Sequence, residues 1–347
     1  MSNPIRYAII FVILFCPSPQ ALAESTDDAL YKMFTLYFEN DTFFGTDYHY
    51  TNGIKLVWTS GDLDNYGKES TLASFARSLG LLLPVIKDTD LEHYFSLAVG
   101  QNMYTPEDTK NPDLIKNDRP YAGLTYFEMG LNGQDRRKVS SWEIVLGMVG
   151  PHSYASDTQK AVHEWNGWEA PAGWKHQIKD EPILNLFFNQ KYKLLFDSIP
   201  GGWGADIIPA WGAGAGNLYA GGHVGVQIRV GYNLPDDFGT NLIRPGCNSN
   251  TLPNEGDATV KNRYRFGLHL FVGADGYYCL RDLTLDGNTY QHSPSVEKEP
   301  LVGSFMAGLG VTFMRCKISF AHVSRSREFK AQKDPEQFGS ITLNYLF

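Results

Sequence analysis

Alternation of apolar and polar side chains is the feature that most limits how this chain can fold. The segment 33–38, "MFTLYF", and the final segment 340–347, "SITLNYLF", both repeat with a period of two residues. That period places successive side chains on opposite faces of a β-strand. The sequence therefore predicts an all-β fold in which the two faces of each strand differ in polarity.

Strand-like segments recur along the whole chain, and we count about twelve of them. They lie at 33–40, 51–60, 93–102, 121–132, 139–149, 182–195, 203–216, 219–233, 262–280, 299–313, 315–325 and 338–347. An even number of strands returns the chain to the side on which it began, as closed bacterial barrels require. The chain also ends on an aromatic residue, Phe347, and 14% of its residues are aromatic. These features favour a transmembrane antiparallel β-barrel of about 12 strands over a soluble β-sandwich.

The first residues have the pattern of an export signal. Arg6 is followed by a short apolar core, "YAIIFVILF", and by a small-residue cleavage site that ends at Ala23. The apolar run is too short to cross a bilayer as a helix. We therefore predict a signal peptide at 1–23 and one barrel domain at 24–347, integral to the bacterial outer membrane.

Charge and cysteine content argue against other classes of protein. The net charge of −8 at pH 7 disfavours a nucleic acid partner, because binding a phosphate backbone needs a basic stripe. Three cysteines follow the signal, Cys247, Cys279 and Cys316, and no Cys-x-x-Cys pair occurs. A disulfide framework is therefore not expected, although a single bridge involving Cys247 stays open.

Strand parity assigns the connections to the two ends of the barrel. If the first strand rises from the periplasm, the connections 41–50, 103–120 and 150–181 lie on the extracellular side, and they hold nearly every chemically suggestive cluster. The long connections on the opposite side, 61–92 and 234–261, lack such clusters. Apolar spacing within the first of these predicts a helix.

The connection 150–181 contains the strongest candidate for proton transfer. Residues 154–166 contain no Gly or Pro, which predicts a short helix in this extracellular loop. Gln159 and His163 are four residues apart, so they share one face of that helix. A neutral imidazole there could accept a proton from water, with Glu169 nearby as a carboxylate. The alternative is an ordinary surface histidine.

The connection 41–50 offers oxygen ligands, and the connection 103–120 offers cations. Asn40 and Asp41 end one strand, and Thr51 begins the next. Carboxylate, amide and backbone oxygens suit a hard cation such as calcium, although an Asn-Asp pair also commonly closes a hairpin as an Asx turn. In the second connection, Lys110 and Arg119 could bind phosphate at a membrane surface. They could equally be solvated charges that pair with neighbouring aspartates.

Three stretches, "FENDTFFGTDYHYTNG", "NDRPYAG" and "GPHSYASDTQKAVH…GWE", together resemble the outer-membrane lipid A 3′-O-deacylases. The resemblance runs in order from about 31 to 347. It implies a twelve-stranded barrel with a calcium-dependent site between the wall and a loop helix, which hydrolyses the ester-linked 3′ acyl group of lipid A. The expected partners are lipid A or lipopolysaccharide and outer-membrane lipids, and the protein is expected to be a monomer.

The resemblance assigns roles to individual residues. Asn40 and Asp41 match the family's metal-binding pair, and His163 matches its catalytic base. The remaining matches are Gln159, Thr51 and Glu169 as further catalytic-site residues, and Lys110 as the loop lysine. Two departures bear on metal geometry and acyl-chain preference: Thr42 stands where the family has a second Asp, and shorter members lack the insertion at 62–91.

Two other functions stay open from the sequence. The run "HYTNG" at 49–53 resembles the His-x-Ser-Asn-Gly run of outer-membrane phospholipase A, with Thr51 in place of the serine nucleophile. A pore or surface-binding barrel without catalysis shares the same strand pattern, because a fold does not fix an activity.

Overall fold

The computed structural model describes residues 32–44, 49–61, 91–195, 201–243, 252–253 and 266–347. Three sequence predictions lie outside these residues: the signal peptide at 1–23, the helix expected within 62–91 and a disulfide involving Cys247. Among the residues described, Cys279 and Cys316 form no disulfide. No described helix is both long enough and apolar enough to cross a membrane.

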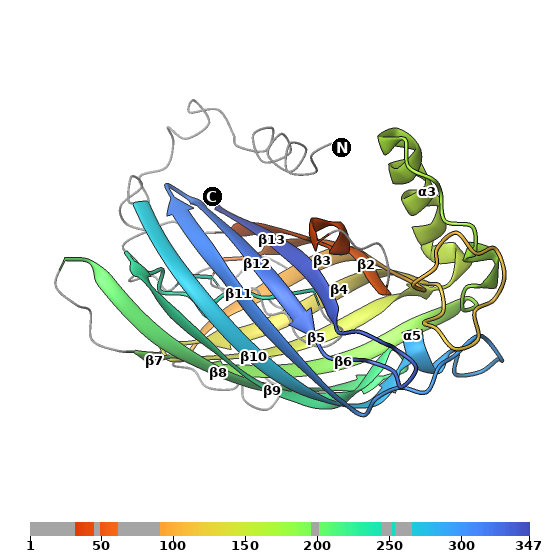
Figure 1. The fold of residues 1–347 in the computed structure, drawn as a ribbon. Helices are drawn as coiled ribbons and strands as arrows, with labels where there is room; N and C mark the ends of the chain where they lie inside the picture. The colour runs from red at the N-terminus through yellow and green to blue at the C-terminus, as the bar shows by residue number, and fades with distance from the viewer. Residues whose placement is uncertain (1–31, 45–48, 62–90, 196–200, 244–251, 254–265) are drawn as a thin grey trace.

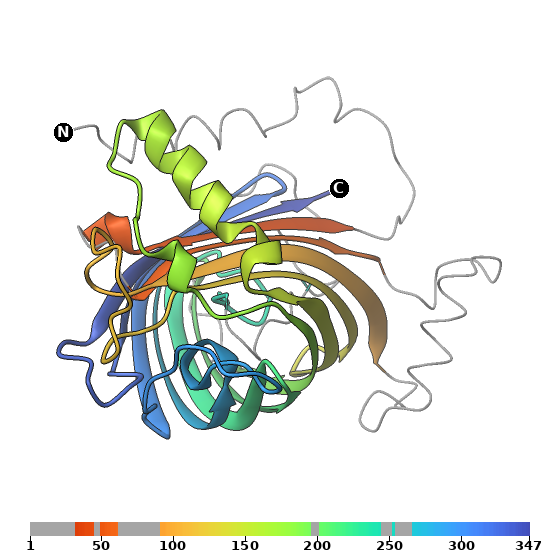
Figure 2. The ribbon, with the colours of Figure 1, turned by 90° about the vertical axis from the view of Figure 1, so that its right-hand side faces the viewer.

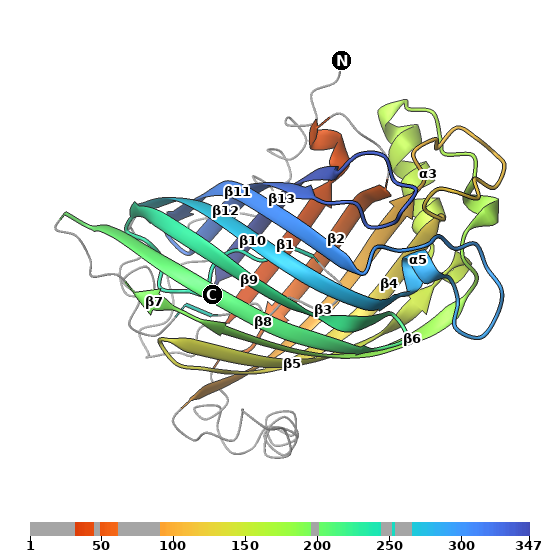
Figure 3. The same cartoon turned by 60° about the horizontal axis from the view of Figure 1, so that its bottom comes forward.

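The chain forms a closed antiparallel β-barrel, which confirms the predicted fold class (Figures 1 and 3). Each strand pairs with its neighbours in sequence, and β1 closes the ring by pairing with β13. The two-residue β7 continues the line of β6 after a break at Lys193, and both pair with β8. The wall therefore has twelve strands. Their bounds are β1 Met33–Asn40, β2 His49–Thr59, β3 Glu92–Thr105, β4 Ala122–Gln134, β5 Lys138–Val149, β6 Glu181–Tyr192, β7 Leu194–Leu195, β8 Trp203–Gly216, β9 Tyr219–Tyr232, β10 Phe266–Asp282, β11 Leu301–Phe313, β12 Cys316–Arg325 and β13 Glu336–Leu346.

The alternation read from the sequence separates the lumen from the outer surface. In β1, Thr35 and Glu39 are buried inside the barrel, whereas Phe34 is exposed on the outside. Inward-facing charges pair inside the barrel, as where Lys55 of β2 donates to both carboxylate oxygens of Glu128 of β4 at 2.8 Å. Polar side chains fill the interior and apolar ones face outward, which is the pattern of a barrel that sits in lipid.

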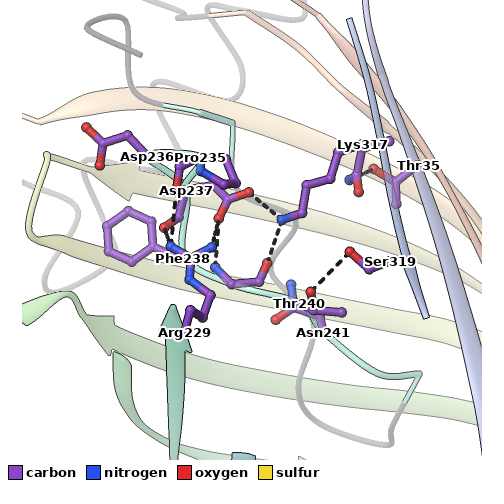
Figure 4. Close-up of polar contacts among 12 residues, drawn as sticks. Thr35, Arg229, Pro235, Asp236, Asp237, Phe238, Thr240, Asn241, Lys317 and Ser319 are labelled. Carbon is purple, nitrogen blue, oxygen red and sulfur yellow. Dashed lines mark hydrogen bonds and ion pairs between the residues drawn. The ribbon is translucent and has the colours of Figure 1, made fainter. Parts of the chain in front are cut away.

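Part of the β9–β10 connection folds into the lumen, which the sequence did not predict. Residues 233–243 leave the end of β9 and run inside the ring (Figure 2). Asp237 contacts Arg229 of β9 and Lys317 of β12, and Thr240 donates to Ser319 Oγ at 3.3 Å (Figure 4). Further along, the backbone N–H of Ile243 donates to Glu39 Oε1 at 2.8 Å. The segment thus runs along the lumen from the last residue of β9, at one end of the barrel, to Glu39, which lies near the other end.

Short helices lie mainly at the end of the barrel where β1, β3 and β5 finish (Figure 1). We call this end the rim. The longest helix is α3, in the β5–β6 connection, and it extends outward beyond the wall in Figures 1 and 2. The helices are η2 Asp41–Phe44, η3 Pro151–Ser153, α3 Ala155–Asn166, η4 Trp174–His176 and α5 Leu283–Asp286.

Candidate active site

The three connections that carry the motifs meet at the rim, as strand parity predicted. The β1–β2, β3–β4 and β5–β6 connections all leave the barrel at this end, beside α3 (Figure 2). The β3–β4 and β5–β6 connections contact each other directly. The backbone N–H of Ala172 donates to the carbonyl oxygen of Thr109 at 2.9 Å, and Lys110 Nζ lies 2.9 Å from a carboxylate oxygen of Glu169.

Special backbone conformations set the limits of α3. Gly150 has φ +101° and Tyr154 has φ +56°, so the chain turns sharply twice before the helix starts at Ala155. Gly167, at φ +70°, ends the helix in the left-handed conformation that favours glycine. The following N–H, of Trp168, donates to the carbonyl oxygen of His163 at 2.8 Å. The helix therefore stops one turn after His163.

The start of α3 is attached to the barrel wall. The carbonyl oxygen of Ser153 accepts hydrogen bonds from Gln101 Nε2 of β3 at 2.8 Å and Thr125 Oγ1 of β4 at 2.7 Å. A Cβ added at Gly123 of β4 would clash with the side chains of Ala155 and Ser153. The glycine that ends the "NDRPYAG" motif therefore lets the helix pack directly on the strand, which fixes its position relative to the barrel.

His163 lies on the buried face of α3, in the last turn, and its ring orientation is fixed. Its Nδ1 lies 2.7 Å from the carbonyl oxygen of Glu169, and a carbonyl can only accept, so Nδ1 carries the proton. The lone pair of the neutral ring is then on Nε2, the nitrogen that could accept a proton. The Trp168 ring packs edge-on against the imidazole at 5.6 Å between centroids.

Glu169 contacts the histidine through its backbone rather than through its carboxylate. Its side chain is exposed and pairs with Lys110, which is also exposed. The hydrogen bond and the charge of Lys110 lower the pKa of the Glu169 carboxyl, and the same interactions with Glu169 raise the pKa of Lys110. The structure thus brings the predicted residues Glu169, Lys110 and His163 together, with the carbonyl of Glu169 as the group that orients the ring.

Asn40, Asp41 and Thr51 form a second group at the rim, over β1 and β2. Asn40 Oδ1 accepts hydrogen bonds from the backbone N–H of Thr42, at 2.8 Å, and from the Thr42 hydroxyl. This is the Asx turn that the sequence left open as an alternative. The Asp41 side chain has no exposed surface. Thr51 lies at an irregularity in the β2–β3 pairing, and its hydroxyl shares a hydrogen bond with that of Thr105 at 2.8 Å.

The donor chemistry of this second group suits a hard cation. A carboxylate from Asp41, an amide oxygen from Asn40 and a hydroxyl from Thr51 are the oxygen ligands that calcium takes. In the described part of the chain, no cluster of three or more His, Cys, Asp or Glu side chains could hold a metal ion. Any ion here would therefore depend on amide, hydroxyl and backbone oxygens beside the Asp41 carboxylate.

Arg119 lies inside the barrel, which does not fit its predicted role as a surface group that binds phosphate. Its side chain is buried and pairs with Glu328 of the β12–β13 connection, and one guanidinium nitrogen donates to Thr284 Oγ1 at 2.9 Å. The guanidinium also lies 4.4 Å from the centre of the Tyr104 ring. Burial alone would lower the pKa of Arg119, but the charge of Glu328 and those of the other acidic groups nearby together outweigh it and raise the pKa. The alternative reading, a solvated charge, does not fit either.

His49, which begins the phospholipase-like run, contacts a different part of the rim from Thr51. Its ring is buried, with Nε2 3.5 Å from Asp118 Oδ1 and with Phe329 edge-on at 5.5 Å. The hydroxyl of Thr51, in contrast, is hydrogen-bonded to Thr105. These contacts give no support to a His49–Thr51 nucleophile pair.

Two residues that support the site were not found from the sequence. Trp174 of η4 donates from Nε1 to Gln159 Oε1 at 2.7 Å, and Tyr121 packs on Trp174 with 4.9 Å between ring centres. Both side chains are buried. Neither has a spacing that predicts its partner, although a tryptophan eight residues after the end of a loop helix is a possible signal, because a buried indole N–H needs an acceptor.

The closed barrel, with its polar lumen and apolar outer surface, defines an integral outer-membrane protein with a candidate site on one rim. A family model described as outer membrane protein LpxR matches residues 8–347. The chain therefore belongs to this family, the outer-membrane lipid A 3′-O-deacylases that the three rim motifs resemble.

One solved structure agrees with the fold. LpxR from Salmonella typhimurium has a TM-score of 0.69 at 17% identity, and the match covers 91% of this chain and 100% of that one. At this identity the likeness concerns the fold alone. The β domain of the Bordetella autotransporter Brka matches with a TM-score of 0.39 at 7% identity, over 91% of this chain and 97% of that one, and this score carries no argument. No curated protein sequence matches.

Proposed function

We propose that this chain is a calcium-dependent esterase that removes the ester-linked 3′ acyloxyacyl group from lipid A in the outer leaflet, acting as a monomer. The observation that carries the proposal is the setting of His163. Its Nδ1 is held by a backbone carbonyl, so Nε2 can accept a proton, and it lies on a loop helix at the rim of a barrel of this family. A rim site fits the substrate, since lipid A lies in the leaflet beside it.

In the proposed reaction His163 acts as a general base. Its Nε2 takes a proton from water as the water oxygen attacks the ester carbonyl carbon. The protonated imidazole is stabilised in place by the Glu169 carbonyl, which continues to accept from Nδ1. His163 then returns the proton to the sugar oxygen as the ester bond breaks. This route requires no nucleophile from the protein.

The metal is part of the proposal because of the donor chemistry at the second group. Asp41, Asn40 and Thr51 are the residues that would hold calcium, through carboxylate, amide and hydroxyl oxygens. A bound calcium ion supplies a positive charge for the oxygen that becomes negative in the transition state. Lys110, which is exposed at the same rim, is placed to attract a lipid phosphate.

The experiment is acyl release by the purified protein in detergent micelles that contain lipid A, with calcium or with a chelator. We expect fatty acid release in calcium, loss of release with chelator, and recovery when calcium is restored. A matched variant, Asp41→Asn, keeps the size of the side chain and removes its charge, so it should need more calcium for the same rate. Release that is unaffected by both chelator and Asp41→Asn would contradict the metal part of the proposal.

The pore alternative is less compatible with the lumen. Segment 233–243 lies inside the barrel and is bound there by ion pairs between Asp237 and two strands. A general diffusion pore needs an open water-filled lumen, so the deacylase is the function that these observations favour.

A further inference from the structure

Only the oxygen of the Gln159 carboxamide has a hydrogen-bond partner among the described residues. Its Oε1 accepts the hydrogen bond from Trp174 Nε1. Its Nε2 is buried and has no hydrogen-bond partner among the residues that the structure describes, and the whole side chain is only 3% exposed. Buried polar groups in folded proteins are nearly always paired. The two N–H groups of Gln159 therefore indicate a ligand atom that accepts hydrogen bonds.

The direction in which Gln159 donates is set by chemistry. An indole nitrogen can only donate, so the oxygen of the carboxamide must face Trp174 and the NH₂ must face away. Trp174 is itself held, because its ring packs on Tyr121, whose hydroxyl donates to the carbonyl oxygen of Thr109 at 3.1 Å. A flip of the carboxamide would place N–H against N–H. The orientation is thus fixed before any ligand binds.

Gln159 and His163 face the same way. They are four residues apart on α3 and are both buried on its inner face. Since the lone pair of His163 is on Nε2, this face presents one proton acceptor and, one turn earlier, two N–H donors. An ester carbonyl oxygen is an acceptor without a proton, so it matches the donors of Gln159.

We propose that Gln159 Nε2 donates a hydrogen bond to the carbonyl oxygen of the acyl ester, and that Trp174 is the positioning residue that keeps the carboxamide in this orientation. The inference rests on the proposed function, because it assigns a donor for the same ester. Water adds to the carbonyl carbon, its proton passes to His163, and the carbonyl π pair moves onto the oxygen that Gln159 contacts. When the intermediate collapses, the bond to the sugar oxygen breaks, and that oxygen takes the proton from His163.

The test is a double-mutant cycle on the full-length protein, with kcat and KM measured for lipid A in calcium-containing micelles. Gln159→Ala should lower kcat by about 100-fold, which is typical for removal of one oxyanion donor. Trp174→Phe should lower kcat by about tenfold, because the carboxamide loses its fixed orientation. KM should change little in either. The double variant should be no slower than Gln159→Ala, since Trp174 has nothing left to orient.

Two further variants keep the test decisive. Gln159→Glu retains an acceptor for Trp174 but has no N–H groups, so it should lose kcat even if Trp174→Phe fails to fold. Trp165→Phe makes the same exchange at a position on α3 that is 80% exposed, and its kcat should equal that of the wild type.

The outcomes distinguish a failure of the Gln159 assignment from a failure of the proposed function. If Gln159→Glu keeps the wild-type kcat, or if Trp174→Phe lowers kcat equally with and without Gln159, this inference is overturned while the proposed function stands. A wild-type protein that releases no acyl group in calcium overturns the proposed function, and this inference with it.

Discussion

The two ends of the barrel differ in how completely their buried donors are paired. At the end away from α3, Arg229 donates to carboxylate and carbonyl oxygens. At the rim, Gln159 is held in one orientation but has donors left for a ligand. Arg229 Nη1 pairs with Asp237 (Figure 4). Its Nε and Nη2 lie 2.8 and 2.5 Å from the two carboxylate oxygens of Asp206. At the rim, Gln159 retains two N–H groups without an acceptor among the described residues. Buried charges whose hydrogen bonds are all made stabilise the fold, whereas an oriented donor without an acceptor can bind a ligand.

Paired charges also explain why segment 233–243 can lie inside the lumen. An isolated charge is costly to bury, but Asp237 meets both Arg229 and Lys317, and Lys193 meets Asp236. The inner end of the segment reaches Glu39 through the N–H of Ile243. The lumen is therefore filled from the end opposite the candidate site.

The largest expected effect is a loss of activity at the rim without a loss of stability. His163→Ala should lower the rate of acyl release by about 10²–10⁴-fold, the usual contribution of a general base. The barrel should remain folded, because α3 is attached to the wall through Ser153 and not through His163. The rate is measured with lipid A in micelles, and folding by the shift in gel mobility on heating. A variant with wild-type activity would remove His163 from the mechanism.

The next effect is expected at the end of the barrel opposite the rim, where a substitution should lower stability and leave activity unchanged. Arg229→Met leaves Asp206 and Asp237 buried with less cationic charge beside them, so the free energy of unfolding should fall by about 3–5 kcal/mol. Urea unfolding in detergent measures it. The fraction that remains folded should still release acyl groups at the wild-type rate.

A matched control removes a charge from the rim instead. Lys110→Ala breaks an exposed ion pair with Glu169, and such pairs contribute little to stability. Its unfolding curve should overlay that of the wild type. Equal destabilisation by Lys110→Ala and Arg229→Met would show that the two ends do not differ in the way described.

The smallest expected effect is the weakening of the ion pair between Arg119 and Glu328 at low pH. Burial alone would raise the pKa of Glu328, but Arg119 and Arg325 outweigh it and lower the pKa from 4.5 to about 2. A carboxyl with a lowered native pKa stabilises the fold above its unfolded pKa, and that contribution is lost as pH falls through the native value. The contact between Arg119 and Glu328 should therefore hold at neutral pH and weaken between about pH 4.5 and 2. Near-ultraviolet circular dichroism follows it, since Arg119 lies on Tyr104, and Glu328→Gln should remove most of this pH dependence.

The wall of this barrel could be predicted from the sequence because each strand is recognised from the alternation within its own residues. Period-two alternation predicted about twelve strands, with bounds close to those observed. Because successive strands run in opposite directions, the same strand order predicted that the three connections with motifs lie at one end. The spacing of Gln159 and His163 gave a shared helix face for the same reason. Local periodicity carries this information wherever a regular element forms.

Contacts between irregular segments could not be predicted, because no period describes them. The direction of Arg119 into the barrel depends on Glu328, more than 200 residues away. Glu169 orients His163 through a backbone carbonyl, and a carbonyl is present at every residue, so its identity gives no signal. Segment 233–243 has partners on β9 and β12 that only the closed barrel brings together.

The most direct measurement is mass spectrometry of lipid A from cells that produce either the wild-type protein or His163→Ala, at equal amounts of folded barrel. The account predicts that wild-type cells lose the mass of the 3′ acyloxyacyl group and that cells with His163→Ala keep it. Lipid A that stays intact beside abundant folded wild-type protein in calcium, or the same loss with His163→Ala, would contradict the account.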